Sequence, residues 1–286
     1  MQGIAGCVRL GTKALAHNDR TITVELSDSF SPADDLRLDD FLEQMRTLKA
    51  ALRETERLVS GTREASLYFR IKHIQKNSPP VITLEAVSDT LDERSRPTYA
   101  NRVVRQLTAN LRIISNKGKL PGRMDYLALE SYRVLTATAE KHRLNVRISA
   151  GNNSVLINSK LRETIDRIAG KDEYSVGSVS GKIEAINLHN RTRKFYIFPI
   201  IGPSRVLGTF KSRDRAKFAS AVDKYVTVFG ILRYKQWDRF PYAIKADLIE
   251  INDPAIATLD GLRGLNVHAT GDLTSQEFVD RLRDEW

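Results

Sequence analysis

The stretch KFYIFPIIGPSRVLGTF (Lys194–Phe210) holds two short alternating runs separated by a turn that contains proline and glycine. Side chains on a β-strand point alternately to its two faces. Phe195 and Ile197 therefore share one face of the first run. Tyr196 and Phe198 share the other face. If the first pair fills a hydrophobic core, the second pair forms an outward aromatic platform.

Similar strand-like runs precede and follow this stretch. The five predicted strands are Val176–Leu188, Lys194–Ile201, Arg205–Phe210, Tyr225–Lys235 and Tyr242–Ile251. A helix-compatible segment, Asp214–Ala221, lies between the third and fourth strands. Five strands with a helix in that place are typical of the OB fold. The sequence thus predicts an OB-like five-stranded β-barrel over residues 176–252.

OB barrels bind oligonucleotides or oligosaccharides with strands two and three and with the loops that join strands one to two and four to five. Bases stack on exposed aromatic rings, at about 1–3 kcal/mol for each base. The candidate residues for binding single-stranded nucleic acid are Arg191, Arg193, Lys194, Tyr196, Phe198, Lys235, Trp237 and Arg239. In the alternative interpretation, the aromatic rings close the barrel ends and the cations are merely solvated.

Composition and charge agree with a soluble binding protein. The chain has 286 residues, a formal net charge of +10 and a single cysteine. Residues 176–252 carry 14 Lys and Arg against 6 Asp and Glu, whereas residues 253–286 carry 3 against 7. A basic surplus attracts polyanions. We expect a cytoplasmic protein, because the sequence has no secretory signal, no possible intrachain disulfide and no apolar run of about 18 residues.

The first 170 residues mix helical and strand patterns and predict an α+β domain. Whether they form one domain or two subdomains, 1–90 and 91–170, stays open. The predicted strands are Gly3–Leu10, Thr21–Leu26, Ser66–Gln75, Val81–Ser88 and a hairpin of Asn145–Ser149 with Ser154–Asn158. The predicted helices are one that Ser31 caps and that continues to Val59, then Tyr99–Ser115, Met124–Lys141 and Lys160–Ala169.

Residues with catalytic or metal-binding chemistry are scattered. The five histidines and Cys7 show no metal-ligand spacing, and the glycine-containing turns lack the pattern of a phosphate-binding loop. The sequence therefore predicts no catalytic residue, no metal and no cofactor. An enzyme with its active site in the N-terminal domain, and a barrel that presents substrate, is the alternative; a cluster of ionisable groups in a cleft of that domain would favour it.

The C-terminal segment, residues 253–286, is predicted to be a linker followed by a docking helix. Thr274 and Glu277 have the spacing of a capping box. Phe278, Leu282 and Trp286 then recur every four residues and are the candidate partner-binding residues. This apolar stripe needs a groove, on the protein itself or on a partner.

The run EFVDRLRDEW (Glu277–Trp286) resembles the toxin-binding tails of bacterial antitoxins that neutralise PIN-domain ribonucleases. In that family, an amphipathic tail lies across the active cleft of the nuclease. The resemblance implies a protein partner of the PIN type and a place in a bacterial toxin–antitoxin or defence module. The rest of the chain departs from the usual antitoxin plan, since no ribbon-helix-helix, AbrB-like or helix-turn-helix module is visible at its start.

Overall fold

The structure, a computed structural model, describes residues 20–28, 36–62, 65–75, 79–88, 96–188, 193–252 and 273–284. The chain divides into two compact units. The first contains residues 1–175 together with the short segments 201–204 and 232–243. The second contains residues 176–200, 205–231 and 244–286. Two five-stranded sheets and the helices around them give the chain a mixed α+β fold, as predicted.

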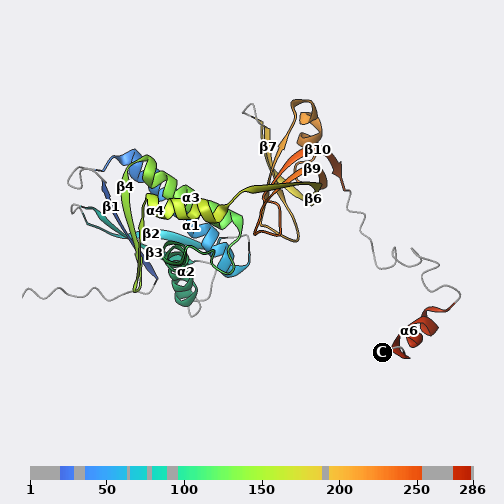
Figure 1. Cartoon of the computed structure of the whole chain (residues 1–286), viewed down its shortest axis with the longest axis horizontal. Coiled ribbons are helices and arrows are strands. Elements are labelled where there is room, and N and C mark those ends of the chain that lie inside the picture. Colours follow the sequence, from blue (N-terminus) through green and yellow to red (C-terminus); the bar gives the residue numbers. More distant parts are fainter. Residues whose placement is uncertain are drawn as a thin grey trace, which may run out of the picture. The chain divides into compact units, whose positions relative to one another are not determined.

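The first sheet lies within the first unit and has the strand order β2-β3-β1-β4-β5 (Figure 1). Its strands are β1 (Thr21–Asp28), β2 (Leu67–Gln75), β3 (Val81–Ser88), β4 (Leu144–Ala150) and β5 (Asn153–Ile157). The predicted strand Gly3–Leu10 lies outside the described residues. All neighbouring strands in this order pair antiparallel. Strands from both halves of the first 170 residues share the sheet, so these halves form one structural unit and not two.

Four helices share a hydrophobic core with this sheet. They are α1 (Leu38–Ser60), α2 (Arg96–Lys117), α3 (Tyr126–Lys141) and α4 (Ser159–Ala169). In β1, Ile22, Val24 and Leu26 are fully buried and the residues between them are half-buried, so only one face of this strand meets the core. Leu107 and Leu111 of α2 belong to the same core. The alternation and helical spacing read from the sequence thus match the packed faces.

Local signals place the ends of several elements. Asp125 caps α3 by accepting a hydrogen bond from Ala128 N, and Asn158 caps α4 in the same way. Gly170 ends α4 with a positive φ of 62° and a ψ of −168°, a conformation that glycine adopts more readily than other residues. In contrast, α1 begins at Leu38, later than the predicted start at Ser31, which lies outside the described residues.

The second sheet has the strand order β10-β8-β7-β6-β9. Its strands are β6 (Asp172–Asn187), β7 (Arg193–Phe198), β8 (Val206–Phe210), β9 (Tyr225–Lys235) and β10 (Ala243–Ile251). A short 3-10 turn, η1 (Ser212–Asp214), and the helix α5 (Arg215–Ser220) stand between β8 and β9, where the sequence predicted a helix. All five predicted strands are present, with bounds that agree to within a few residues.

Three phenylalanines fill the core of this sheet. Phe218 of α5 lies with its ring centroid 4.2 Å from that of Phe210 and 4.8 Å from that of Phe195. Gly208 on β8 makes room for the Phe195 ring, because a Cβ at this glycine would lie only 1.9 Å from the ring. The strand glycine is thus required by close packing.

The last helix, α6 (Ser275–Asp284), begins with the predicted capping box. Thr274 N donates to Glu277 Oε2 at 2.8 Å, and Glu277 N donates to Thr274 Oγ1 at 3.4 Å. Within the described part of the chain, no helix has both the length and the apolar character that crossing a bilayer requires.

Candidate nucleic-acid interface

The outward face of β7 carries the aromatic platform expected from the sequence. Phe195 and Ile197 are fully buried in the core of the second sheet. Tyr196 and Phe198 alternate with them and are half-exposed on the opposite face. The alternation places the two pairs on opposite faces, and the burial of Phe195 and Ile197 leaves Tyr196 and Phe198 as the rings that can meet a ligand.

The positions beside this platform on the neighbouring strands are mostly uncharged. Tyr196 lies in register with Ala185 on β6 and with Leu207 on β8. Lys194, one pleat away, lies between Asn187 and Thr209. Neither neighbour carries a charge, and the ammonium group of Lys194 has no ion-pair partner among the described residues. It is therefore available to bind a phosphate.

Two arginines extend the positive charge beside the platform. The guanidinium carbon of Arg205 lies 5.5 Å from the centroid of the Tyr196 ring, within the range of a cation–π contact. Arg193 is half-buried and donates from Nη1 to Ser212 Oγ. The sequence analysis missed Arg205, although its place at the start of the second strand of the face was visible in the sequence.

The second predicted element of the face, the loop between β9 and β10, is placed differently from the expectation. Lys235 is only 8% exposed. Its Nζ lies 2.6 Å from Asp172 Oδ1 and donates to Gly170 O at 3.1 Å. The rings of Tyr126 and Tyr242 flank it, with centroids 5.2 and 5.8 Å from Nζ. All of these residues belong to the first unit, so Lys235 is engaged in packing and is not presented to a ligand.

Asp172 is the centre of this cluster. Burial alone would raise its pKa, but hydrogen bonds from Lys235 and Arg233 outweigh burial and lower the pKa to about 2. Burial, followed by the nearby Glu130, raises the pKa of Tyr126 to about 12. Burial and a hydrogen bond to Asp172 also raise the pKa of Tyr242. Because Asp172 is charged and the tyrosines are neutral at physiological pH, the cluster is a static ion pair within an aromatic cage.

Trp237, like Lys235, packs within the first unit. Its ring packs against the hydrophobic core of the first unit, and its Nε1 is buried without a hydrogen-bond partner among the described residues. Arg239 remains exposed. Of the predicted loop residues, Arg239 is thus exposed, Trp237 is half-buried and Lys235 is buried. Arg191, in the other predicted loop, lies outside the described residues.

The predicted docking residues of the tail fall only partly within the described chain. Phe278 is half-buried on α6, Leu282 lies in the same helix, and Trp286 lies outside the described residues. Hydrogen bonds from the Thr274 side chain and backbone lower the pKa of Glu277, so the cap is charged at neutral pH.

A further cluster of ionisable groups in the first unit surrounds His142. His142 Nδ1 lies 2.6 Å from Asp40 Oδ1, and its Nε2 lies 2.6 Å from Glu43 Oε2. Lys141 Nζ is 2.9 Å from the same Glu43 carboxylate. Both ring nitrogens of His142 are thus taken by carboxylates that join α1 to the end of α3. With both nitrogens occupied, the imidazole has no free position for acid–base chemistry on a substrate.

No protein-family model matches the chain, and no curated protein matches it. The residues and their geometry are therefore the basis for the function.

Proposed function

We propose that this protein is a non-catalytic binding protein whose second unit is an OB-like barrel for single-stranded nucleic acid. Hydrogen bonds from Tyr242 N to Arg233 O and from Asn252 N to Tyr225 O join β9 to β10 and support closure of the sheet into a barrel. The position of α5, before β9, is also that of the OB fold.

The observation that carries the proposal is the outward pair Tyr196 and Phe198 beside Lys194 and Arg205. Two rings on one strand face offer stacking surfaces to consecutive bases, and the adjacent cations neutralise phosphates. Stacking tolerates every base, because each has a π face. The proposed binding is therefore independent of sequence and sensitive to salt.

Fluorescence anisotropy with a labelled single strand tests this proposal. Tyr196→Ala and Phe198→Ala should each cost about 1–3 kcal/mol, which is at least about fivefold in affinity. The slope of log affinity against log salt should be about −0.7 for each phosphate neutralised. Lys194→Glu removes one phosphate contact and should make this slope less steep. Tyr68→Ala removes an exposed ring from the first unit and is the matched control. Equal affinities of all these proteins, or no binding at low salt by the folded protein, would refute the proposal.

We further propose that α6 docks on a protein partner, for which a PIN-type ribonuclease is the candidate. The capping box supports a helix that starts at a defined residue, and Phe278 supports an apolar contact. Removal of residues 275–286 should leave the melting temperature unchanged and abolish co-purification with a co-expressed PIN-domain ribonuclease. A truncated protein that melts early and still retains the partner would show that the helix belongs to the protein's own core.

The enzyme alternative has weaker support. In the first unit, a cavity between α1 and α2 is lined by apolar side chains, two arginines and two amides, and no carboxylate, histidine or cysteine is among its described lining residues. Arginine stays protonated and cannot exchange protons near neutral pH. Such a cavity suits the binding of an anion better than acid–base catalysis.

A further inference from the structure

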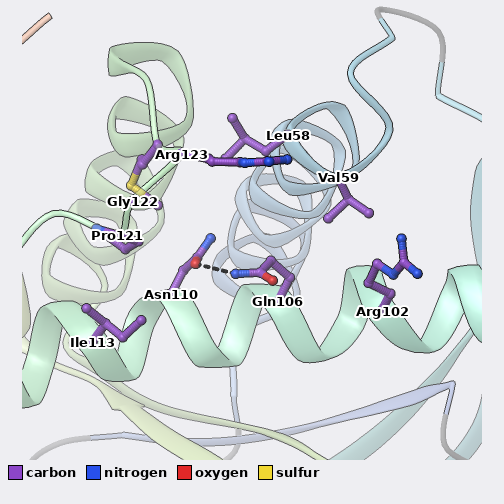
Figure 2. A pocket seen from close by; sticks show the side chains of 10 residues that line it. Leu58, Val59, Arg102, Gln106, Asn110, Ile113, Pro121, Gly122 and Arg123 are labelled. Atoms are coloured by element: carbon purple, nitrogen blue, oxygen red, sulfur yellow. Dashed lines mark hydrogen bonds between the residues drawn. The ribbon is translucent and has the colours of Figure 1, made fainter.

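The cavity in the first unit has a volume of about 460 Å³ and lies between the end of α1, the middle of α2 and the segment that leads to α3 (Figure 2). Its apolar walls are Leu58, Val59, Ile113, Pro121 and Met124. Gln106 and Asn110 contribute amides from α2, and Arg102 and Arg123 are exposed at its edge. The volume falls in the range of small-ligand sites, about 300–1,000 Å³.

A chain of buried hydrogen bonds determines how the two amides are oriented. Thr55 Oγ1 donates to Ala51 O at 2.7 Å, so the Tyr132 hydroxyl, 2.8 Å away, must donate to Thr55. Tyr132 then accepts from Asn110 Nδ2 at 3.1 Å, which turns Asn110 Oδ1 towards Gln106. A hydroxyl has a single hydrogen to donate, so each step determines the next.

Gln106 is the end of this chain. It donates from Nε2 to Asn110 Oδ1 at 2.7 Å (Figure 2). This bond uses one of the two amide hydrogens of Gln106. The second hydrogen and the carbonyl oxygen remain available to a ligand. The cavity therefore presents one donor and one acceptor side by side. Nucleic-acid bases have edges that pair with this arrangement, as adenine does with Gln side chains.

No acidic residue in the described ranges pairs with the arginines at the cavity mouth. Asp125, close to Arg123 in sequence, is bound by Arg57, whose Nη2 lies 2.6 Å from Asp125 Oδ2, and it also caps α3. Among the described residues, Arg102 and Arg123 form no ion pair with a carboxylate. Two free guanidinium groups at the mouth of a partly apolar cavity favour a phosphate, which arginine binds with two parallel hydrogen bonds.

We propose that this cavity binds a phosphorylated nucleoside. The apolar walls cover the faces of the base, the Gln106 amide pairs with its edge, and Arg102 and Arg123 hold the phosphate. A phosphate alone would leave the apolar walls and the amide unused. This site lies in the first unit and is independent of the platform on β7.

The ligand has two possible sources: a free nucleotide or the end of a strand. A second cavity of about 420 Å³ shares Arg102 and Gln106 with the first and is also lined by Arg105 and Asn153. A strand whose last nucleotide occupies the first cavity could continue into the second, past Arg105. The proposal covers both sources because the bound group is the same.

Isothermal titration of the full chain with AMP, adenosine and short 5′- or 3′-phosphorylated oligonucleotides tests the proposal. AMP should bind at least tenfold more tightly than adenosine. Arg102→Ala and Arg123→Ala should each weaken AMP binding about tenfold, and Gln106→Leu should weaken both AMP and adenosine. Arg102 and Arg123 are exposed and unpaired among the described residues, so their variants should keep the melting temperature of the parent protein.

Arg105→Ala and Tyr196→Ala are the matched controls. Neither residue lines the first cavity, so both variants should bind AMP normally, even if the proposed barrel interface fails. A phosphorylated oligonucleotide that binds more tightly than AMP, and that Arg105→Ala weakens, would identify a strand end. Equal or tighter binding of AMP would identify a free nucleotide. If no phosphorylated probe binds, or if the cavity variants bind like the parent protein, the proposal is overturned.

Discussion

Replacement of Asp172 by asparagine should destabilise the first unit, because it leaves a buried lysine without its counter-ion. Asp172 lies 2.6 Å from Lys235 Nζ and accepts from Arg233 Nε at 3.0 Å. Arg233 is exposed enough to be hydrated after the change. Lys235 is not, since it is 8% exposed and retains only Gly170 O and two tyrosine faces.

Two independent considerations give the size of this effect. Removal of one partner of a buried ion pair costs about 3–5 kcal/mol, and the contacts that Lys235 keeps place this case at the lower end. The drop in the pKa of Asp172 from 3.8 to about 2 corresponds to about 2 kcal/mol of stability at neutral pH. We therefore expect the free energy of unfolding to fall by about 2–3 kcal/mol.

Urea denaturation followed by tryptophan fluorescence measures this change. The chain has two tryptophans, and in a Trp286→Phe background only Trp237 reports, from its place against the core of the first unit. Glu140→Gln is the matched control, because Glu140 is also in the first unit and pairs with Arg162 at 2.5 Å, but its side chain is 48% exposed. The control should change stability by less than about 0.5 kcal/mol, as surface ion pairs contribute little.

The pH dependence has a defined sign. The folded state lowers the pKa of Asp172, so its contribution is present above pH 3.8 and is lost as the pH falls towards 2. The difference in stability between the parent protein and Asp172→Asn should be constant from pH 7 to 5 and shrink below pH 4. A difference below about 1 kcal/mol at pH 7, or one that grows as the pH falls, would refute the reasoning.

Three further substitutions test other parts of the structure. Gly208→Ala would place a Cβ 1.9 Å from the Phe195 ring and should cost more than about 3 kcal/mol, measured by thermal unfolding; a normal melting temperature would contradict the packing described. Tyr132→Phe leaves the buried Asn110 Nδ2 without its acceptor and should cost about 1–3 kcal/mol in the same assay, so an unchanged melt would exclude the hydrogen-bond chain. Thr274→Ala in a synthetic peptide of the tail removes an N-cap worth about 1 kcal/mol and should lower the helix content measured by circular dichroism. An unchanged helix content would show that the helix does not begin at Thr274.

The elements of the fold were largely predictable because their signals are local. The alternation in Lys194–Phe198 separates Phe195 and Ile197 from Tyr196 and Phe198, and the structure buries the first pair and leaves the second half-exposed. The β9 strand has the same bounds as predicted, Tyr225–Lys235. Side chains two residues apart on a strand share a face whatever the rest of the chain does.

The tertiary structure decided which of the predicted binding side chains are buried. In sequence, Lys235 and Trp237 look like an exposed basic and aromatic loop. In the structure, Asp172, Tyr126 and Tyr242 surround the lysine, and the half-buried indole packs against the core. The nucleotide-sized cavity likewise combines residues of α1 and α2 with residues of the segment before α3, and no spacing along the chain links them. Periodicity determines which face a side chain occupies, whereas the partner it meets there depends on segments that only folding brings together.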